Sequence, residues 1–222
     1  MSDSKHIRAA LFDLDGVVFD TEPQYSRFWG GQCRLYHPDQ PGLENMIKGQ
    51  TLVQIFDRFF SGELKKERET ITRRLDDFEL TMRFDYINGF TGFIALLRSH
   101  GVKTAIVTSS NKTKMAVVRK RHPELAELFD TILTSEDFER SKPDPDCYLK
   151  AARRLECAGD ECVVFEDSIN GLSSARAAKM FVVGLATTNS LDTVKPLCDL
   201  PVTDFTELDY SRLVTQFSMA AT

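Results

Sequence analysis

The sequence contains no apolar run approaching the ~20 residues that a membrane-spanning helix needs. Its opening stretch, Met1-Ser2-Asp3-Ser4-Lys5-His6, has no apolar signal region either. Both absences argue against an integral membrane protein and against export by a cleaved leader. We therefore expect a cytoplasmic protein with no membrane partner.

Cysteine and histidine are scarce, and neither type is grouped. The five cysteines are scattered outside any Cys-x-x-Cys spacing, which argues against a zinc site or a disulfide framework. The four histidines belong to no motif, so we expect surface or packing roles for His6, His37, His100 and His122. No Gly-x-x-x-x-Gly-Lys loop is present, which argues against a P-loop kinase or ATPase.

Positive charge is not concentrated anywhere along the chain. The net charge is −5, and the short basic stretches, such as 119–121 and 153–154, fall at predicted exposed helix positions. An acidic protein with dispersed basic residues lacks the electrostatic footprint of a nucleic-acid-binding protein. We expect no nucleic-acid partner.

The pattern that is present alternates strands with helices. Of 222 residues, 42% are hydrophobic and 27% charged, values typical of a globular protein. An apolar run over 9–12 ends at Asp13, and later apolar runs occur at 104–107, 131–133, 163–165 and 181–183. Helical patterns lie between them, at 112–121, 146–155 and 169–178. This alternation predicts an α/β fold with a doubly wound parallel sheet.

One segment interrupts this alternation directly after the first strand. Apolar residues recur at helical spacing in two stretches of residues 21–86, around Tyr25 to Cys33 and from Leu64 to Met82. We therefore predict a discontinuous core domain, 1–20 and 87–222, with an inserted helical cap domain, 21–86. In an open parallel sheet the ligand binds at the carboxyl ends of the strands, so the cap should cover that edge.

Polar motifs follow four of the strands or their loops. They are, in chain order, Asp13-Leu14-Asp15-Gly16, Thr108-Ser109-Ser110-Asn111, Ser141-Lys142-Pro143 and Glu166-Asp167-Ser168. Taken singly, each has an ordinary explanation as a helix cap, a turn or a helix start. Because the ends of parallel strands share one edge, all four can converge on one crevice.

With these four motifs in this order, the sequence resembles the haloacid-dehalogenase-like superfamily, specifically its small-cap phosphatases and β-phosphoglucomutase-like enzymes. The longest matching stretch is Leu11-Phe12-Asp13-Leu14-Asp15-Gly16-Val17-Val18-Phe19-Asp20-Thr21-Glu22-Pro23, and the resemblance covers nearly the whole chain. It implies a Rossmann-like core with a helical cap and, as activity, hydrolysis of a small phosphorylated metabolite, with a sugar phosphate as the family-level expectation.

The resemblance also implies roles for individual residues. Asp13 would attack phosphorus and become an aspartyl-phosphate, and Asp15 would transfer protons to the leaving group and from water. Lys142 would add positive charge beside the nucleophile and the phosphoryl oxygens. Hydrogen bonds to the phosphoryl group would come from Thr108 and its neighbours Ser109 and Ser110, and Lys48 in the cap would contact the substrate.

Carboxylates gathered around a phosphate repel it, so a cation is needed, and Mg²⁺ suits oxygen ligands. By resemblance, its ligands are the Asp13 carboxylate, the Asp15 backbone carbonyl and the Asp167 carboxylate, with Glu166 assisting. Nothing in the sequence calls for an organic cofactor. A monomer is the default expectation.

Three other functions remain open. A phospho-accepting receiver module shares the clustered Asp residues but needs neither a cap nor a second, proton-transferring Asp. The superfamily's dehalogenases lack that second Asp and use no magnesium. A β-phosphoglucomutase-like mutase would need a His and an Arg in the cap, where this sequence has Tyr25 and Leu52. A shift in the cap alignment could instead bring Arg58 to the second position.

Overall fold

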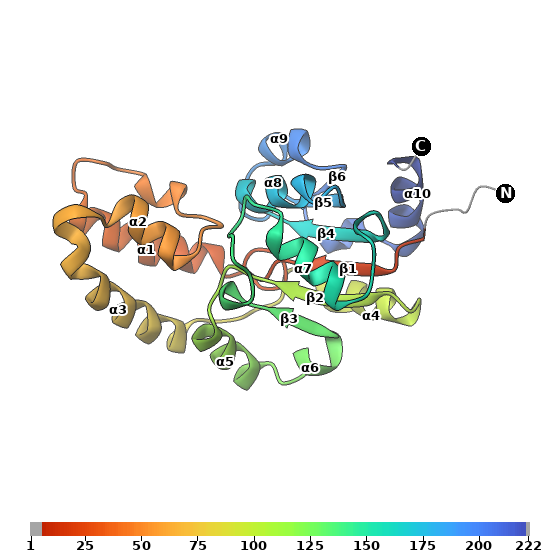
Figure 1. Cartoon of the computed structure of the whole chain (residues 1–222), viewed down its shortest axis with the longest axis horizontal. Coiled ribbons are helices and arrows are strands. Elements are labelled where there is room, and N and C mark those ends of the chain that lie inside the picture. Colours follow the sequence, from red (N-terminus) through yellow and green to blue (C-terminus); the bar gives the residue numbers. More distant parts are fainter. Residues whose placement is uncertain (1–5, 221–222) are drawn as a thin grey trace.

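The computed structural model describes residues 6–220, and its centre is a six-stranded parallel sheet in the order β3-β2-β1-β4-β5-β6 (Figure 1). The strands are β1 (Ala9–Phe12), β2 (Lys103–Val107), β3 (Thr131–Leu133), β4 (Cys162–Glu166), β5 (Phe181–Leu185) and β6 (Leu200–Val202). The first strand, β1, pairs with β2 on one side and β4 on the other, so the first acidic motif begins at the middle of the sheet.

Helices cover both faces of this sheet. Along β1, Ala10 and Phe12 face a cluster that includes residues of α4 (Phe90–Ser99), α5 (Lys112–Arg121), α6 (Leu125–Leu128) and α10 (Tyr210–Ala220). The alternate residues Ala9 and Leu11 face α7 (Asp146–Arg154), α8 (Ile169–Ala177) and α9 (Leu191–Val194). Strand side chains alternate between faces, so a strand covered on both sides is apolar throughout. The predicted doubly wound fold is confirmed.

Three further helices lie between β1 and α4 in the chain and stand beside the sheet (Figure 1). They are α1 (Glu22–Tyr36), α2 (Leu52–Phe59) and α3 (Arg68–Thr81), and we call them the cap. They have a buried apolar cluster of their own, which includes Trp29, Ile55 and Ile71. The insertion of an all-helical segment is as predicted. The domain boundaries at 20/21 and 86/87 stay a prediction, and residues 1–5 and 221–222 of the predicted core lie outside the described residues.

The cap is joined to the sheet through two chain segments that run side by side. Asp20 N donates to Asp85 O at 2.8 Å, and Ile87 N donates to Val18 O at 3.0 Å. Short bridges also link Phe19 to Asp15 and to Tyr86. These bonds place the entry and exit of the cap directly beside the first acidic motif.

The remaining helical elements are short 3-10 helices: η1 (Leu43–Met46), η2 (Gly62–Glu67), η3 (Ser135–Asp137), η4 (Gly159–Glu161), η5 (Lys195–Leu197) and η6 (Phe205–Glu207).

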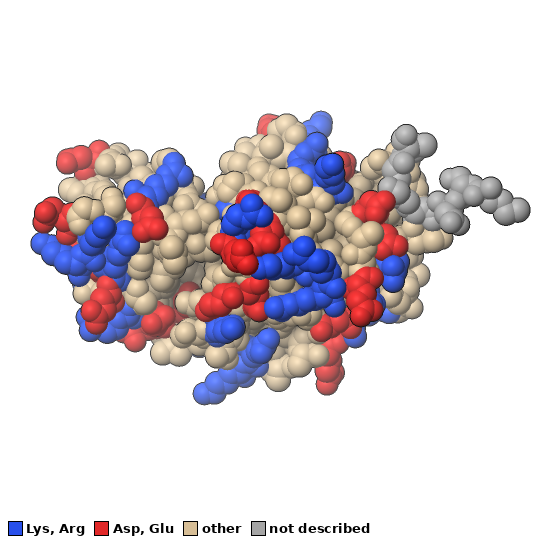
Figure 2. All heavy atoms as spheres, viewed as in Figure 1, with Lys and Arg blue, Asp and Glu red and all other residues tan. Residues whose placement is uncertain are grey.

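None of the helices within residues 6–220 has both the length and the apolar character of a membrane span. On the face drawn in Figure 2, Lys and Arg side chains are interspersed with Asp and Glu side chains.

Candidate active site

The carboxyl edge of the sheet carries the residues that the sequence singled out. Asp13 follows β1, Thr108 follows β2, and Glu166 ends β4 directly before Asp167. The loop before α7 brings Lys142 to the same edge. The structure therefore places the four motifs together.

Lys142 connects two of these carboxylates. Its Nζ donates to Asp13 Oδ1 at 2.6 Å, to Glu166 Oε1 at 2.6 Å and to the carbonyl of Val107 at 3.1 Å. Desolvation lowers the pKa of this buried ammonium, but the two carboxylates more than reverse that effect and raise its pKa above the ordinary value. Lys142 is thus a fixed positive charge against Asp13.

Three buried carboxylates remain crowded despite this lysine. Oxygens of Asp13, Glu166 and Asp167 all lie within 4.8 Å of one another. Desolvation is the main reason why the pKa of Asp13 is raised to about 7, with Lys142 opposing and the neighbouring acids adding to it. Desolvation and the charges of Glu166 and Asp13 likewise raise the pKa of Asp167 well above its ordinary value. A divalent cation would relieve this repulsion.

Asp167 and Glu166 differ in what their oxygens still need. Both carboxylate oxygens of Asp167 are buried without a hydrogen-bond partner. Glu166 Oε1 already accepts from Lys142 and from Tyr148 Oη at 2.7 Å. Its Oε2 accepts from the backbone nitrogens of Asp167 and Ser168 and from Ser168 Oγ, at 3.1 to 3.3 Å. Buried acceptor oxygens are normally hydrogen-bonded or bound to a cation, so the unpartnered Asp167 carboxylate is suited to act as a cation ligand. Both oxygens of Glu166 already accept hydrogen bonds.

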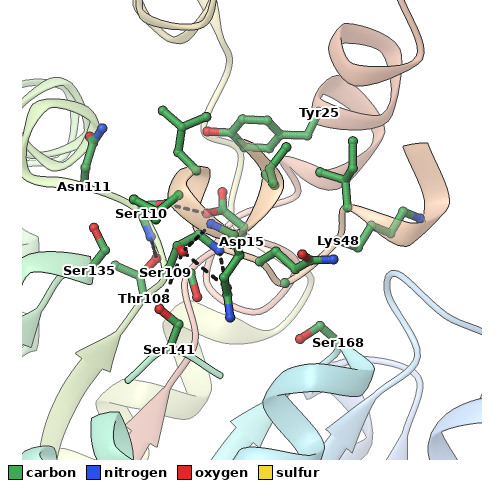
Figure 3. A pocket seen from close by; sticks show the side chains of 18 of the residues that line it. Asp15, Tyr25, Lys48, Thr108, Ser109, Ser110, Asn111, Ser135, Ser141 and Ser168 are labelled. Carbon is green, nitrogen blue, oxygen red and sulfur yellow. Dashed lines mark hydrogen bonds between the residues drawn. The ribbon is translucent and has the colours of Figure 1, made fainter. Parts of the chain in front are cut away.

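The carboxylate of Asp15 points away from this cluster. It accepts from Thr21 Oγ1 at 2.5 Å, Ser110 Oγ at 3.0 Å and Lys114 Nζ at 2.5 and 2.6 Å. The backbone nitrogen of Asp15 donates to Asp13 Oδ2 at 3.0 Å, which fixes the Asp13 carboxylate relative to the Asp15 backbone. Figure 3 shows Asp15 between Ser110 and the ring of Tyr25. Two carboxylates two residues apart therefore have different environments.

The hydroxyl motif after β2 lies beside Asp15 (Figure 3). Thr108 Oγ1 accepts from Ser110 N at 3.0 Å. Ser109 Oγ is buried and has no hydrogen-bond partner. A buried hydroxyl without a partner at the edge of a cavity is available to a polar ligand.

A cavity of about 600 Å³ lies between these groups and the cap. Its cap side includes the apolar residues Trp29, Ile47, Ile55, Phe56 and Leu75. Among the described residues that line it, Lys48 is the one basic side chain, whereas carboxylates are numerous. At one side of the cavity the cap loop approaches the core closely at Gly49, whose φ is +71° and where a Cβ would lie 2.6 Å from Ser168 Oγ.

A family model described as haloacid dehalogenase-like hydrolase matches residues 7–179. The chain belongs to the haloacid dehalogenase-like hydrolases. This confirms the resemblance found in the four motifs, and membership in a hydrolase family leaves the receiver module without support.

Proteins similar in sequence to this chain include both a phosphatase and a mutase. The chain is 35% identical to hexitol phosphatase A of Escherichia coli over 79% of its length and 81% of the relative's. It is 25% identical to a β-phosphoglucomutase of Bacillus subtilis, over 81% and 83% of the two lengths. The fold matches a family IA hydrolase of Entamoeba histolytica with a TM-score of 0.81 at 24% identity, covering 95% of this chain and 99% of that one.

Several contacts at the site of this haloacid dehalogenase-like hydrolase were not predicted. Thr21 and Lys114 hold Asp15, while Tyr148 and Ser168 hold Glu166. Thr21 stands inside the first matching stretch and could have been noticed there. Lys114 had a weaker signal: a lysine in the first turn of a helix, where positive charge is unfavourable.

Proposed function

We propose that this hydrolase is a Mg²⁺-dependent phosphatase that removes the phosphoryl group from monophosphorylated sugars or sugar alcohols. The observation that carries the proposal is the pairing of Asp13 with Lys142 beside the unpartnered oxygens of Asp167. A nucleophilic carboxylate, a fixed cation and carboxylate oxygens without hydrogen-bond partners together suit phosphoryl transfer.

Asp13, the backbone carbonyl of Asp15 and Asp167 would hold Mg²⁺, which supplies charge neutralisation for the phosphoryl oxygens. Glu166 supports this set indirectly, because its two oxygens already accept hydrogen bonds from Lys142, Tyr148 and the turn at Ser168. Such a cation would offset the desolvation and mutual repulsion that raise the pKa of Asp13 and of Asp167.

The reaction has two displacements. An oxygen of Asp13 attacks phosphorus while the P–O bond to the alcohol breaks, and the Asp15 carboxyl gives its proton to the departing oxygen. The aspartyl-phosphate on Asp13 is then attacked by water, whose proton passes to the Asp15 carboxylate. Inorganic phosphate leaves, and both aspartates return to their starting forms.

The phosphoryl oxygens would be held by the motif after β2 and by Lys142. Ser109 Oγ has no partner within the described protein and could donate to a phosphoryl oxygen, and the Thr108 hydroxyl lies beside it. Lys142 Nζ is 2.6 Å from Asp13 Oδ1, so its charge also acts on a phosphoryl group attached there.

The lining of the cavity favours an alcohol with many hydroxyls and one phosphate. Glu22, Glu44 and Glu79 can form hydrogen bonds with hydroxyl groups and offer a second phosphate no positive charge. Lys48 is the single described cation there, and the apolar cap wall can pack against the carbon skeleton.

The β-phosphoglucomutase relative makes a mutase the second candidate. Leu52 lines the cavity and provides no cationic grip, and Tyr25 is already bonded to Glu79 at 2.7 Å. Arg58 is exposed and stacks on Phe59 rather than lining the cavity. These contacts favour hydrolysis over transfer of the phosphoryl group to a hydroxyl of a sugar monophosphate.

The proposal is tested by measuring phosphate release with Mg²⁺ from a panel: sorbitol 6-phosphate, fructose 1-phosphate, glucose 6-phosphate, glycerol 3-phosphate and a nucleoside 5′-monophosphate. We expect turnover of sugar or sugar-alcohol monophosphates to exceed that of the others. No phosphate release from any compound would overturn the phosphatase. Turnover confined to the nucleotide would overturn the substrate class.

A further inference from the structure

Lys114 is a buried cation to which the reaction above gives no role. It is 1% exposed and stands in the first turn of α5, where the Asn111 side chain accepts from its backbone nitrogen at 2.9 Å. Positive charge is disfavoured in the first turn of a helix, and burial of an ammonium is unfavourable unless it is paired. Helix stability therefore does not explain a lysine at this position.

The partners of Lys114 lie in the active site. Its Nζ is 2.6 Å from Asp15 Oδ1, 2.5 Å from Asp15 Oδ2 and 3.0 Å from Ser110 Oγ. Thr21 and Ser110 each contact one oxygen of Asp15, whereas Lys114 contacts both. Its ammonium thus bridges the two oxygens and holds the Asp15 carboxylate toward α5.

The opposite side of the ammonium faces the cap. The ring of Tyr25, on α1, lies 4.6 Å from Nζ, within cation–π range. Tyr25 Oη donates to Glu79 on α3 at 2.7 Å, and the carboxylate of Glu79 is buried. Lys114 therefore lies between an acid of the sheet and an aromatic side chain of the cap, and Figure 3 shows the Tyr25 ring close to Asp15.

We propose that Lys114 is a positioning residue for proton transfer: it fixes the Asp15 carboxylate beside the phosphoryl site, and Tyr25 makes that placement depend on the cap. This inference rests on the proposed function, because only an acid–base role of Asp15 gives the contact a consequence for the reaction.

The test compares two esters that differ in their need for an acid. An alkyl phosphate, the fastest compound of the panel above, needs its leaving oxygen protonated, whereas 2,4-dinitrophenyl phosphate releases a stable anion unaided. The parameter is kcat/KM, which reports the step in which the ester bond breaks. Lys114→Met retains the length and apolar stem of the side chain without the charge.

We expect Lys114→Met to lower kcat/KM about 10²-fold for the alkyl ester and less than about fivefold for the dinitrophenyl ester, since acid–base assistance contributes roughly 10²–10⁴-fold. Asp15→Asn should show the same dependence on leaving group. In the double variant, the loss should be no larger than in Asp15→Asn alone, because the lysine acts through that carboxylate. Lys112→Met, an exposed lysine in the same helical turn, is the matched control and should match the wild type.

Equal losses of kcat/KM on both esters, or additive losses in the double variant, would overturn the inference. The proposed phosphatase would still stand in that case, because it depends on turnover by the wild type. If Lys114→Met does not fold by circular dichroism, Lys114→Arg takes its place. That variant keeps the charge but moves the donors, so a loss confined to the alkyl ester supports the inference and unchanged kinetics on both esters contradict it. Absence of phosphate release by the wild type overturns the proposed function itself.

Discussion

Gln54 of the cap donates its Nε2–H to the backbone carbonyl of Lys142 at 3.0 Å, across the cavity from its own helix. The same side chain uses its Oε1 to accept from Thr51 N at 2.9 Å and so closes a capping box at the start of α2. One amide therefore stabilises a cap helix and holds the loop whose lysine contacts the nucleophile.

Gln54→Glu separates these two functions. A glutamate can still accept from Thr51 at the helix N-terminus, but it has no N–H for the Lys142 carbonyl. We expect a Tm within about 3 °C of wild type and kcat/KM lowered roughly two- to tenfold, the equivalent of one hydrogen bond. Gln54→Ala, which loses both contacts, should lower Tm as well. Wild-type kcat/KM in Gln54→Glu would show that the contact does not matter for turnover.

Asp13→Asn should fold normally and lose about 10⁴-fold or more in kcat, because an amide is a poor nucleophile for phosphorus. Phosphate release measures the loss, and circular dichroism checks the fold. Asp20→Asn is the matched control, since Asp20 belongs to the same stretch of sequence but is exposed. Activity of Asp13→Asn within tenfold of wild type would exclude Asp13 as the nucleophile.

Chelation by EDTA should abolish turnover, and Mg²⁺ should restore it. Ca²⁺ should substitute poorly, because its higher and looser coordination would misplace Asp13. Mg²⁺ at about 100 times its Kd should also stabilise the wild type by about 2.7 kcal/mol. Asp167→Asn should reduce the increase in Tm that Mg²⁺ causes, because the substitution removes the unpartnered carboxylate. Full activity in EDTA is the result that would refute the metal site.

Acid stability should depend on Asp137. Desolvation raises the pKa of this carboxyl, but hydrogen bonds from Thr134 and the pair with Arg154 outweigh it and lower the pKa to about 2. A depressed pKa stabilises the fold above the unfolded value near 4, and this contribution is lost as pH falls toward 2. Asp137→Asn should therefore cost about 1 kcal/mol of unfolding free energy at pH 7, after allowance for solvent screening, with the difference from wild type shrinking between pH 4 and 2. Chemical denaturation across that range measures it, with the exposed Asp39→Asn as control. A constant difference at all pH values would contradict the assignment.

A coupled assay for glucose 6-phosphate, with β-glucose 1-phosphate and a bisphosphate activator, should show little or no mutase activity. Leu52 can offer a distal phosphate no hydrogen bond, whereas an arginine contact is worth roughly 1.5–3 kcal/mol, or about 10²-fold. Water should therefore compete well for the aspartyl-phosphate. Isomerisation faster than phosphate release would replace the phosphatase with a mutase and leave the fold and Asp13 unaffected.

The parts of the fold and site that could be predicted are those with a local signal. Strand β1 is apolar on both faces and ends at Asp13, and helix α5 has the residues 112–121 that its pattern indicated. The four motifs lie together because parallel strands share their carboxyl edge. Strand β6 has three residues and a central proline, which leaves no periodic pattern to recognise.

Contacts between distant residues left no such signal. Lys114 and Asp15 are 99 residues apart, and Gln54 and Lys142 are 88 apart. The first pair depends on where α5 packs relative to the end of β1, and the second on how the cap packs over the sheet. No spacing within either segment reports such packing. The helical pattern from Leu64 onward was also only partly an α-helix, because residues 62–67 form a 3-10 turn before α3 begins at Arg68.

The central position of β1 has a consequence for the nascent chain. Ala9 pairs with Lys103 on one side and with Cys162 on the other. When the ribosome has made the first hundred residues, this apolar strand has neither neighbour, while α1, α2 and α3 can already bury their own cluster. An unpaired apolar strand is a template for association with other chains. Until β4 has been synthesised through Glu166, one edge of β1 lacks its native neighbour and is open to such association.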